Sequence, residues 1–264
     1  SLVEKTLQFY DQMNIKYSFD QFYSKSNLQI EKFSITELCE KLLLPKETVR
    51  RKVLELENQG IIKRSGKKLF IVRDTLYAAK ATDTLTEIAT ILHEFNKILK
   101  KEKLVQDVYS VKEIIRSMKE NFSFCWYQFN KFWFTYLNRW RSEVKDLETL
   151  GIGLVVVINA VKNKDFSPNQ KLSSYSKEVM GSDTRGVNAM SISEITGIPR
   201  PTVVRKLKFL IDKKFLYINE KKLISFHAKD NAFLKTNEIV NKNVIDLSNF
   251  VFRVFNQIRI INSN

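Results

Sequence analysis

Apolar residues recur at helical spacing in the segment that starts at Val49. Val49, Val53 and Leu56 fall at positions i, i+4 and i+7, which places them on one stripe of a helix. The residues between them are mostly charged, so the pattern predicts a helix with one apolar side and one basic side. Gly60 follows the last apolar position and is expected to end this helix, because glycine readily adopts the left-handed conformation at a helix C-terminus.

Short elements flank this basic helix on both sides. Upstream, residues 34–44 (SITELCEKLLL) predict a short helix for which Ser34 or Thr36 is the N-cap. Downstream, IIKR at 61–64 and KKLFIVRD at 67–74 predict two strands around a turn. The predicted order is therefore helix, tight turn, basic helix and β-hairpin.

A second copy of this pattern follows at an offset of 154 residues. PRPTVVRKLKFLIDKKFLYINEKKLI at 199–224 aligns without a gap with PKETVRRKVLELENQGIIKRSGKKLF at 45–70. The matched pairs include Thr48 with Thr202, Val49 with Val203, Arg51 with Arg205, Lys52 with Lys206 and Leu56 with Leu210. Upstream, SISEITGIPRPTV predicts a shorter helix and a turn at Gly197, three residues tighter than in the first copy. Lys214 replaces Gly60, and INE replaces RSG, so the second hairpin is predicted to be less basic.

The element order in residues 34–74 resembles the winged helix-turn-helix of the MarR and Crp classes of bacterial regulator. Its most specific part is TVRRKVLELENQGII, and the second copy is the closer match to the Crp-type pattern. The resemblance implies that the basic helix enters the DNA major groove and that the hairpin is a wing near the backbone or minor groove. We therefore expect a mainly α fold with small β-hairpin wings. Two winged-helix units in one chain would be joined by long helices in a pseudo-two-fold arrangement.

An aromatic segment lies between the copies, FSFCWYQFNKFWFTYLNRWR at 122–141. Its large rings repeat at alternating spacings of four and three residues: Phe122, Trp126, Phe129, Trp133, Tyr136 and Trp140. This seam predicts a helix that packs in the core or forms a homodimer interface, and a pocket for a planar effector is the alternative. The identity of any small-molecule effector stays unknown from the sequence.

Further helices and one polar stretch complete the predicted organisation. Apolar stripes predict helices at 84–99 and 245–260, and residues 147–161 form the first helix of the second unit. The polar residues 162–189 predict a long surface loop. The expected division is 1–104 for the first unit with its following helix, 105–146 for the aromatic connector and 147–264 for the second unit with its C-terminal helix.

The charge balance points to a polyanionic partner. Lys and Arg number 44 against 29 Asp and Glu, a net charge of +15 that suits nucleic acid or an anionic membrane surface. The longest apolar run, LGIGLVVVINAV, has 12 residues and is too short to span a bilayer. We therefore expect no membrane partner and a cytoplasmic location. Cys39 and Cys125 lack any metal-site spacing and are expected to be buried free thiols in a reducing compartment.

The candidate DNA-binding residues follow from the resemblance and from the chemistry of base edges. Arginine pairs with guanine through two hydrogen bonds, and an aliphatic side chain contacts the thymine methyl group. The recognition-helix candidates are Lys46, Thr48, Arg50 and Arg51 in the first copy, and Arg200, Thr202, Val204 and Arg205 in the second. The wing candidates for phosphate contacts are Lys63, Arg64, Lys67, Lys68, Lys221 and Lys222. Glu47 is discordant at such a surface and fits best as a favourable charge at a helix N-terminus.

Nothing in the sequence indicates an enzyme. The two histidines, His93 and His227, lie in no metal-binding or catalytic-triad motif, and no glycine-rich phosphate loop is present. We therefore expect no catalytic residues, no metal and no cofactor. The predicted function is sequence-specific binding of double-stranded DNA by a bacterial transcription regulator with two non-identical recognition helices. Two alternatives remain open: a plasmid- or phage-type replication initiator that binds directly repeated sites, and a winged-helix adaptor that binds protein.

Overall fold

The computed structural model describes residues 2–25, 27–30, 34–42, 44–66, 68–72, 74–75, 81–162, 170–181 and 186–263. These residues are mainly helical, and the chain divides into two compact units. Unit 1 comprises Ser1–Phe134 together with Leu247–Asn264, and unit 2 comprises Thr135–Asp246. The C-terminal segment belongs to unit 1, so these boundaries differ from the expected division at 104 and 146.

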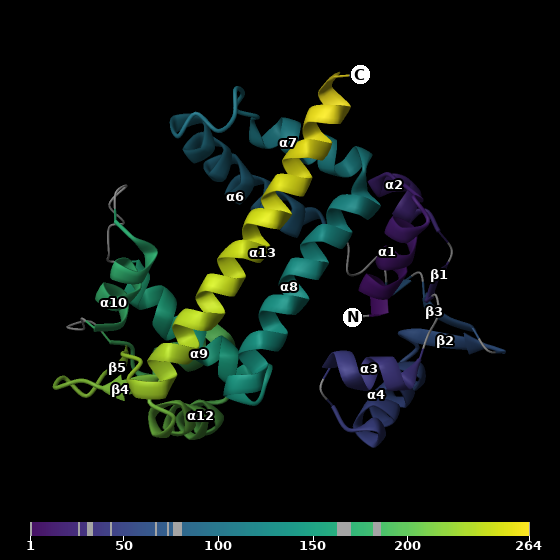
Figure 1. The fold of residues 1–264 in the computed structure, drawn as a ribbon. Coiled ribbons are helices and arrows are strands. Elements are labelled where there is room, and N and C mark those ends of the chain that lie inside the picture. Colours follow the sequence, from purple (N-terminus) through teal and green to yellow (C-terminus); the bar gives the residue numbers. More distant parts are fainter. Residues whose placement is uncertain are drawn as a thin grey trace. The chain divides into compact units, whose positions relative to one another are not determined.

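Unit 1 contains the predicted helix-turn-helix and hairpin, preceded by elements that the sequence pattern did not predict. The early elements are α1 (Leu2–Gln12), α2 (Phe19–Tyr23) and β1 (Asn27–Ile30). The predicted elements are α3 (Ile35–Leu42), α4 (Lys46–Asn58), β2 (Ile62–Ser65) and β3 (Lys68–Val72). Figure 1 shows α3 and α4 beside this small sheet. The sheet is antiparallel with the order β1-β3-β2, so the hairpin gains a third strand.

The core of unit 1 explains why the sheet and helices form. Ile71 of β3 lies opposite both Leu28 of β1 and Ile62 of β2, and all three side chains are buried. Alternate strand residues point to the same face, so one face of the sheet packs inward. β1 has only four residues, of which two are buried, and this pattern is too short to identify a strand in the sequence.

The remaining helices of unit 1 include those predicted from apolar stripes at 84–99, 122–141 and 245–260, and one helix at 111–120 that was not predicted. They are α6 (Thr82–Lys101), α7 (Val111–Glu120), the first part of α8 (Phe122–Val144) and the last part of α13 (Asp230–Ser263). Along α8 the ring of Trp126 stacks on those of Phe122 and Phe129, at centroid distances of 5.5 and 5.1 Å. Phe250 of α13 packs against Phe129 and Phe132 at 6.1 and 6.0 Å. In unit 1 Phe122, Trp126 and Phe129 of the aromatic seam are therefore packed into or against the core, whereas Trp133 is 41% exposed.

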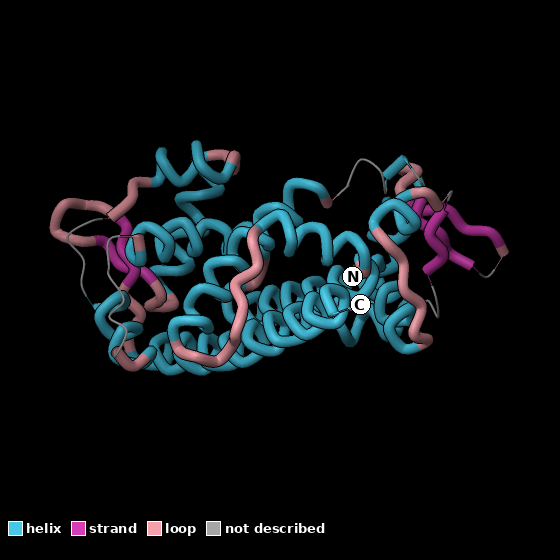
Figure 2. The backbone as a smooth tube through the Cα atoms, turned by 90° about the horizontal axis from the view of Figure 1, so that it is seen from above, coloured by secondary structure: helices cyan, strands magenta, loops and turns pink. Residues whose placement is uncertain are grey.

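Unit 2 repeats the order of helix, helix pair and hairpin. Its elements, besides the parts of α8 and α13 that it contains, are α9 (Leu147–Val161), α10 (Leu172–Gly181), α11 (Ala189–Thr196), α12 (Arg200–Asp212), β4 (Leu216–Ile218) and β5 (Ile224–Phe226). Figure 2 shows the strands as a small group among helices. Val187, just before α11, pairs with Ile224 of β5 in an isolated antiparallel bridge.

The expected long loop at 162–189 is wrong for the residues that form α10. Tyr175 and Val179 are one helical turn apart, and both pack against the core of unit 2, where Val179 is buried. This single apolar row is enough to hold an otherwise polar helix. Residues 163–169 and 182–185 lie outside the described part of the chain.

The helices of the two pairs begin and end at equivalent positions of the two copies. α11 begins and ends 154 residues after α3, and α12 begins and ends 154 residues after α4. Three residues connect the helices in both pairs, so the expectation of a tighter second turn is wrong. The reason is that α3 stops at Leu42, and the Leu44 amide donates to the Cys39 carbonyl at 3.1 Å. Leu44, the last residue of SITELCEKLLL, therefore belongs to the turn.

Candidate nucleic-acid interface

Helix α4 is held in unit 1 by one apolar side and exposes the other. Val49 and Val53 are 3% and 6% exposed, and Leu56 is half-buried against the same core. Five exposed residues of the first turns are compared below with α12: Lys46, Glu47, Arg50, Arg51 and Leu54. Lys52, Glu55 and Asn58 of the same helix are exposed as well. Thr48 is half-buried at the edge of this surface. Three of the four recognition-helix residues predicted here therefore lie on one solvent-facing side.

Helix α12 has the same division between core and surface. Val203 and Leu207 are buried, and Thr202 is half-buried like Thr48. The exposed residues are Arg200, Pro201, Val204, Arg205, Lys208 and, at the end of the helix, Asp212. Each of them lies 154 residues after an exposed residue of α4, so the two exposed faces can be compared position by position.

At the five compared positions, the two exposed faces share one residue and differ in three. Arg51 matches Arg205, and a positive charge is kept where Lys46 matches Arg200. The chemically different pairs are Glu47 with Pro201, Arg50 with Val204 and Leu54 with Lys208. Lys208 was missed in the sequence, although its spacing of four residues from Val204 would have placed it on this face. The two helices therefore present different side chains at equivalent positions.

Some basic residues of α4 and its hairpin form ion pairs within unit 1. The Arg64 Nε of the wing lies 3.0 Å from the Glu57 Oε1 of α4, and Lys52 Nζ lies 2.8 Å from Glu55 Oε2. The hydrogen bond and charge of Lys52 hold the pKa of Glu55 below its ordinary value. Lys46, Arg50, Lys63 and Lys68 form no ion pair with any residue that the structure describes. Lys67 lies outside the described residues.

The β4-β5 hairpin of unit 2, predicted to be the second wing, is organised by a buried asparagine. The Asn219 Oδ1 accepts hydrogen bonds from the amides of Lys221 and Leu223, both at 3.0 Å. Its backbone pairs with Leu223 and Lys222, each at 2.9 Å, and Asn219 Nδ2 donates to Ser225 Oγ at 3.3 Å. Lys221 and Lys222 are exposed at the tip. The asparagine of INE therefore fixes the turn that presents both predicted lysines.

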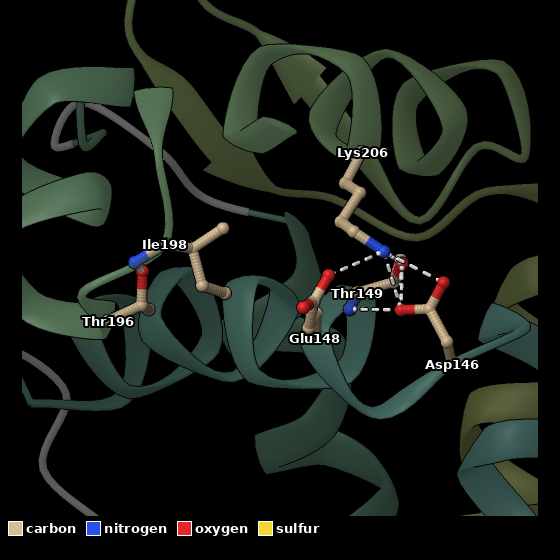
Figure 3. A network of polar contacts seen from close by, with 6 residues as sticks. All are labelled: Asp146, Glu148, Thr149, Thr196, Ile198 and Lys206. Atoms are coloured by element: carbon tan, nitrogen blue, oxygen red, sulfur yellow. Dashed lines mark hydrogen bonds and ion pairs between the residues drawn. The ribbon is translucent and has the colours of Figure 1, made fainter. Parts of the chain in front are cut away.

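The turn between α11 and α12 is closed by short hydrogen bonds. Gly197 has φ +67°, and its amide donates to the Ser193 carbonyl at 2.9 Å. Ser193 Oγ donates to the Ile198 carbonyl at 2.7 Å. The Ile198 amide donates to Thr196 Oγ1 at 3.3 Å, and Figure 3 draws these two residues. The turn predicted at Gly197 is thus confirmed, with α12 starting directly after Pro199.

Lys206 is buried, unlike the residue that it matches in α4. Its Nζ lies 2.7 and 2.8 Å from the two carboxylate oxygens of Asp146 and 3.2 Å from Thr149 Oγ1 (Figure 3). Glu148 Oε2 is also 3.2 Å away. Asp146 is the N-cap of α9 and accepts from the Thr149 amide at 2.8 Å. Burial opposes ionisation of Asp146, but hydrogen bonds from Lys206 and Thr149 outweigh it and lower the pKa.

In unit 1 the helix pair α3 and α4 is joined to α1 by ion pairs of α3, not of the second helix of the pair. Two ion pairs join α1 to α3, namely Lys5 with Glu37 and Glu4 with Lys41, the latter at 2.8 Å. Glu4 and Lys5 are buried, whereas Glu37 is exposed and Lys41 is half-buried. Both units therefore use ionic contacts to join the first helix to the helix pair, but through different helices.

The cysteines and histidines have surroundings that do not indicate a reactive centre. Burial raises the pKa of the Cys125 thiol to about 12, so it stays protonated, and Cys39 is half-buried rather than buried. His93 Nδ1 lies 2.7 Å from the Tyr109 carbonyl. Within the described ranges, no cluster of three or more His, Cys, Asp or Glu is arranged to hold a metal ion. No helix among the described residues is long and apolar enough to cross a membrane.

Comparison with known proteins adds one match. Residues 28–66 match the DeoR-like helix-turn-helix domain. The matched segment runs from β1 through α3 and α4 and ends directly after β2. Searches of curated proteins and of solved structures gave no match to the chain. The match and the element order together support a winged helix-turn-helix DNA-binding unit in this part of unit 1.

Proposed function

We propose that the chain is a transcription regulator that binds double-stranded DNA through two non-identical recognition helices, α4 and α12. In this proposal α11, α12 and the β4-β5 hairpin form a second winged helix, like the MarR and Crp classes that the sequence resembles. The protein acts in the bacterial cytoplasm, without enzymatic activity or a cofactor.

The matched exposed faces of α4 and α12 carry this proposal. Both helices have 13 residues and follow a proline. Val49 and Val53 are buried at the same positions as Val203 and Leu207, and the five compared positions are exposed in both helices. Each helix carries an exposed arginine at the same position, Arg51 in α4 and Arg205 in α12. Arginine is the residue most often used for specific contacts with guanine in the major groove.

The charge of each unit also favours DNA. Unit 1 contains 25 Lys and Arg against 17 Asp and Glu, and unit 2 contains 19 against 12. Each unit is therefore basic by itself, as expected if both contact phosphates. Because the exposed faces differ at three positions, the two half-sites should differ in sequence, with centres one or more helical turns apart, about 10 bp per turn.

Selection from a randomised duplex pool at near-physiological salt tests the proposal. The wild-type chain should enrich a bipartite motif, and Arg51→Ala and Arg205→Ala should each weaken the enrichment of a different half. Both arginines are exposed, so neither substitution removes core contacts. Lys101→Ala is the matched control, because it removes an exposed positive charge from α6, outside both predicted DNA surfaces.

The arrangement of the selected half-sites distinguishes the remaining functions. Inverted half-sites support the regulator, and directly repeated half-sites would point to a replication initiator. Retention without any motif, lost as salt is raised, would contradict sequence-specific binding and leave only the attraction of a basic protein to phosphate. A protein-binding adaptor would then be the better explanation.

A further inference from the structure

Lys206 connects the second candidate recognition helix directly to the first helix of unit 2. All four of its contacts, to both oxygens of Asp146, to Thr149 and to Glu148, are within the N-terminal cap and first turn of α9. The side chain of Lys206 is 7% exposed, so its aliphatic part passes through the interface between the two helices. Figure 3 shows its ammonium group pointing at this turn.

The equivalent residue of unit 1 makes no such connection. Lys52 lies 154 residues earlier, is 60% exposed and pairs with Glu55 of its own helix. Burying a lysine is unfavourable unless its charge is paired and hydrogen-bonded. Well-packed apolar residues would stabilise this interface as well as a buried ion pair does. The contact is therefore better explained by the orientation that it imposes than by the stability that it adds.

Apolar packing determines which side of α12 faces the core, but its contacts are less directional than hydrogen bonds. Val203, Leu207 and Leu210 bury against the core of unit 2. Charge-assisted hydrogen bonds are directional, and their donor and acceptor must meet within a narrow range of distance. Asp146 is itself held by the amide and hydroxyl of Thr149, both at 2.8 Å. Lys206 thus contacts a fixed acceptor.

We propose that Lys206 is a positioning residue that sets the rotation of α12 against α9 and thereby determines which exposed side chains reach the bases. This rests on the proposed function, because the rotation matters only if α12 reads DNA. The residues that would lose their alignment are Val204, Arg205 and Lys208 on the exposed side of the same helix. The phosphate contacts of the wing do not depend on this alignment.

Lys206→Met tests the proposal, with Lys52→Met as its matched control. Methionine keeps the unbranched apolar stem and removes the charge, and Asp146 can still cap α9 through Thr149. Each variant is put through selection from the randomised duplex pool, and its salt dependence is measured on one fixed duplex. We expect Lys206→Met to lower discrimination at the half-site read by α12 by roughly tenfold at the best-read base pair. The other half-site, the salt dependence and the behaviour of Lys52→Met should be unchanged.

Thermal unfolding followed by circular dichroism shows whether Lys206→Met folds. A second variant tests the proposal if it does not. Asp146→Asn removes the carboxylate that makes two of the four contacts of Lys206, while Glu148 remains to pair with the buried ammonium group. Asparagine is as good an N-cap as aspartate, so α9 keeps its start. The same selective loss at one half-site is expected.

The outcomes separate this proposal from the proposed function. A bipartite motif for the wild type with both halves intact in the folded Lys206 variant, or in the carboxylate variant, would overturn the positioning role alone. An equal loss at both half-sites would also overturn it, because a general structural defect then explains the effect. If the wild type enriches no motif, both the proposed function and the positioning role are wrong.

Discussion

Gly60 and Lys214 follow α4 and α12 at equivalent positions and adopt the same left-handed conformation, with φ of +70° and +62°. Lysine seldom takes a positive φ, because its Cβ approaches the following carbonyl oxygen. The two units therefore share the backbone geometry of this turn although the residue differs. The turn places the first hairpin strand directly after the candidate recognition helix in both units.

Replacing Gly60 by alanine should destabilise unit 1 by about 1 kcal/mol, because an L-residue is strained at this φ. Nothing lies within 4 Å of an added Cβ, so strain is the only expected effect. Gly151→Ala is the control, since Gly151 lies inside α9 with equally open space and no positive φ. It should stabilise the protein by about 0.5–1 kcal/mol. Chemical denaturation measures both, and changes of the same sign would contradict the explanation.

Gly186→Ala should be more harmful, for a different reason. An added Cβ would lie 2.5 Å from Leu223 Cβ and 2.8 Å from the Ile224 carbonyl oxygen. The backbone must shift, which should cost about 1–3 kcal/mol. The reciprocal hydrogen bonds between Val187 and Ile224, at 2.8 and 2.9 Å, should weaken. Hydrogen exchange of these two amides reports the change.

Gly153→Ala is the control for the clash at Gly186. Its added Cβ meets only Leu210 Cδ1 at 3.6 Å, an ordinary contact. Amide protection at Val187 and Ile224 should therefore stay at the wild-type level in this variant. Unchanged protection in Gly186→Ala as well would show that the close approach is not needed for the bridge.

Asn219→Ala should loosen the wing of unit 2. The substitution removes the acceptor for the Lys221 and Leu223 amides and leaves buried polar groups unpaired, which should cost about 1–3 kcal/mol. If Lys221 and Lys222 contact phosphates, the slope of log affinity against log salt should become shallower by up to about two. Glu220→Ala, at the exposed neighbouring position, should not make it shallower. An unchanged slope in a folded Asn219 variant would remove the wing from the DNA surface.

The two cysteines should differ in reactivity. Burial raises the pKa of Cys125 to about 12 from the ordinary 9.0, so its thiolate is scarce, and its thiol is shielded from solvent. Alkylation with iodoacetamide at pH 8, followed by mass spectrometry, should modify Cys39 alone in the folded protein and both residues in denaturant.

The same shift has a consequence at alkaline pH. Because the pKa of Cys125 is higher in the folded state, its contribution to stability is fully present below pH 9 and is lost as the pH rises towards 12. Cys125→Ser should reduce the loss of stability over this range. Rapid labelling of Cys125 in the folded protein would contradict its burial.

The sequence predicted the elements that have strong periodicity or a definite stop signal. The helices and turns of both candidate reading units were located from the stripe of Val49 and Val53 and from the stop signals Gly60 and Gly197. The helix at 147–161 was predicted with the same first and last residues that the structure shows. These features depend on local spacing, which is present in the chain itself. Short elements were missed, because β1 and α10 are stabilised by partners distant in sequence.

The candidate site was predicted less completely than the fold. Exposure of Arg51 and Arg205 followed from helical spacing, but the pairing of Arg64 with Glu57 depends on how the wing packs beside α4. Lys52 and Lys206 show most clearly what the sequence could not predict, because they are equivalent residues of the two copies, yet Lys52 is exposed and Lys206 is buried. Only the acidic N-terminus of α9, 60 residues from Lys206, explains the difference.

The central claim, that α4 and α12 are two non-identical readers in one chain, is tested most directly by giving α4 the residues of α12 at the five compared exposed positions. The variant carries Lys46→Arg, Glu47→Pro, Arg50→Val and Leu54→Lys, all at exposed positions of α4, and is put through the same selection from a randomised duplex pool. We expect the half-site read by α4 to become a second copy of the one read by α12. A motif unchanged from that of the wild type, or an equal loss of both halves, would contradict the account.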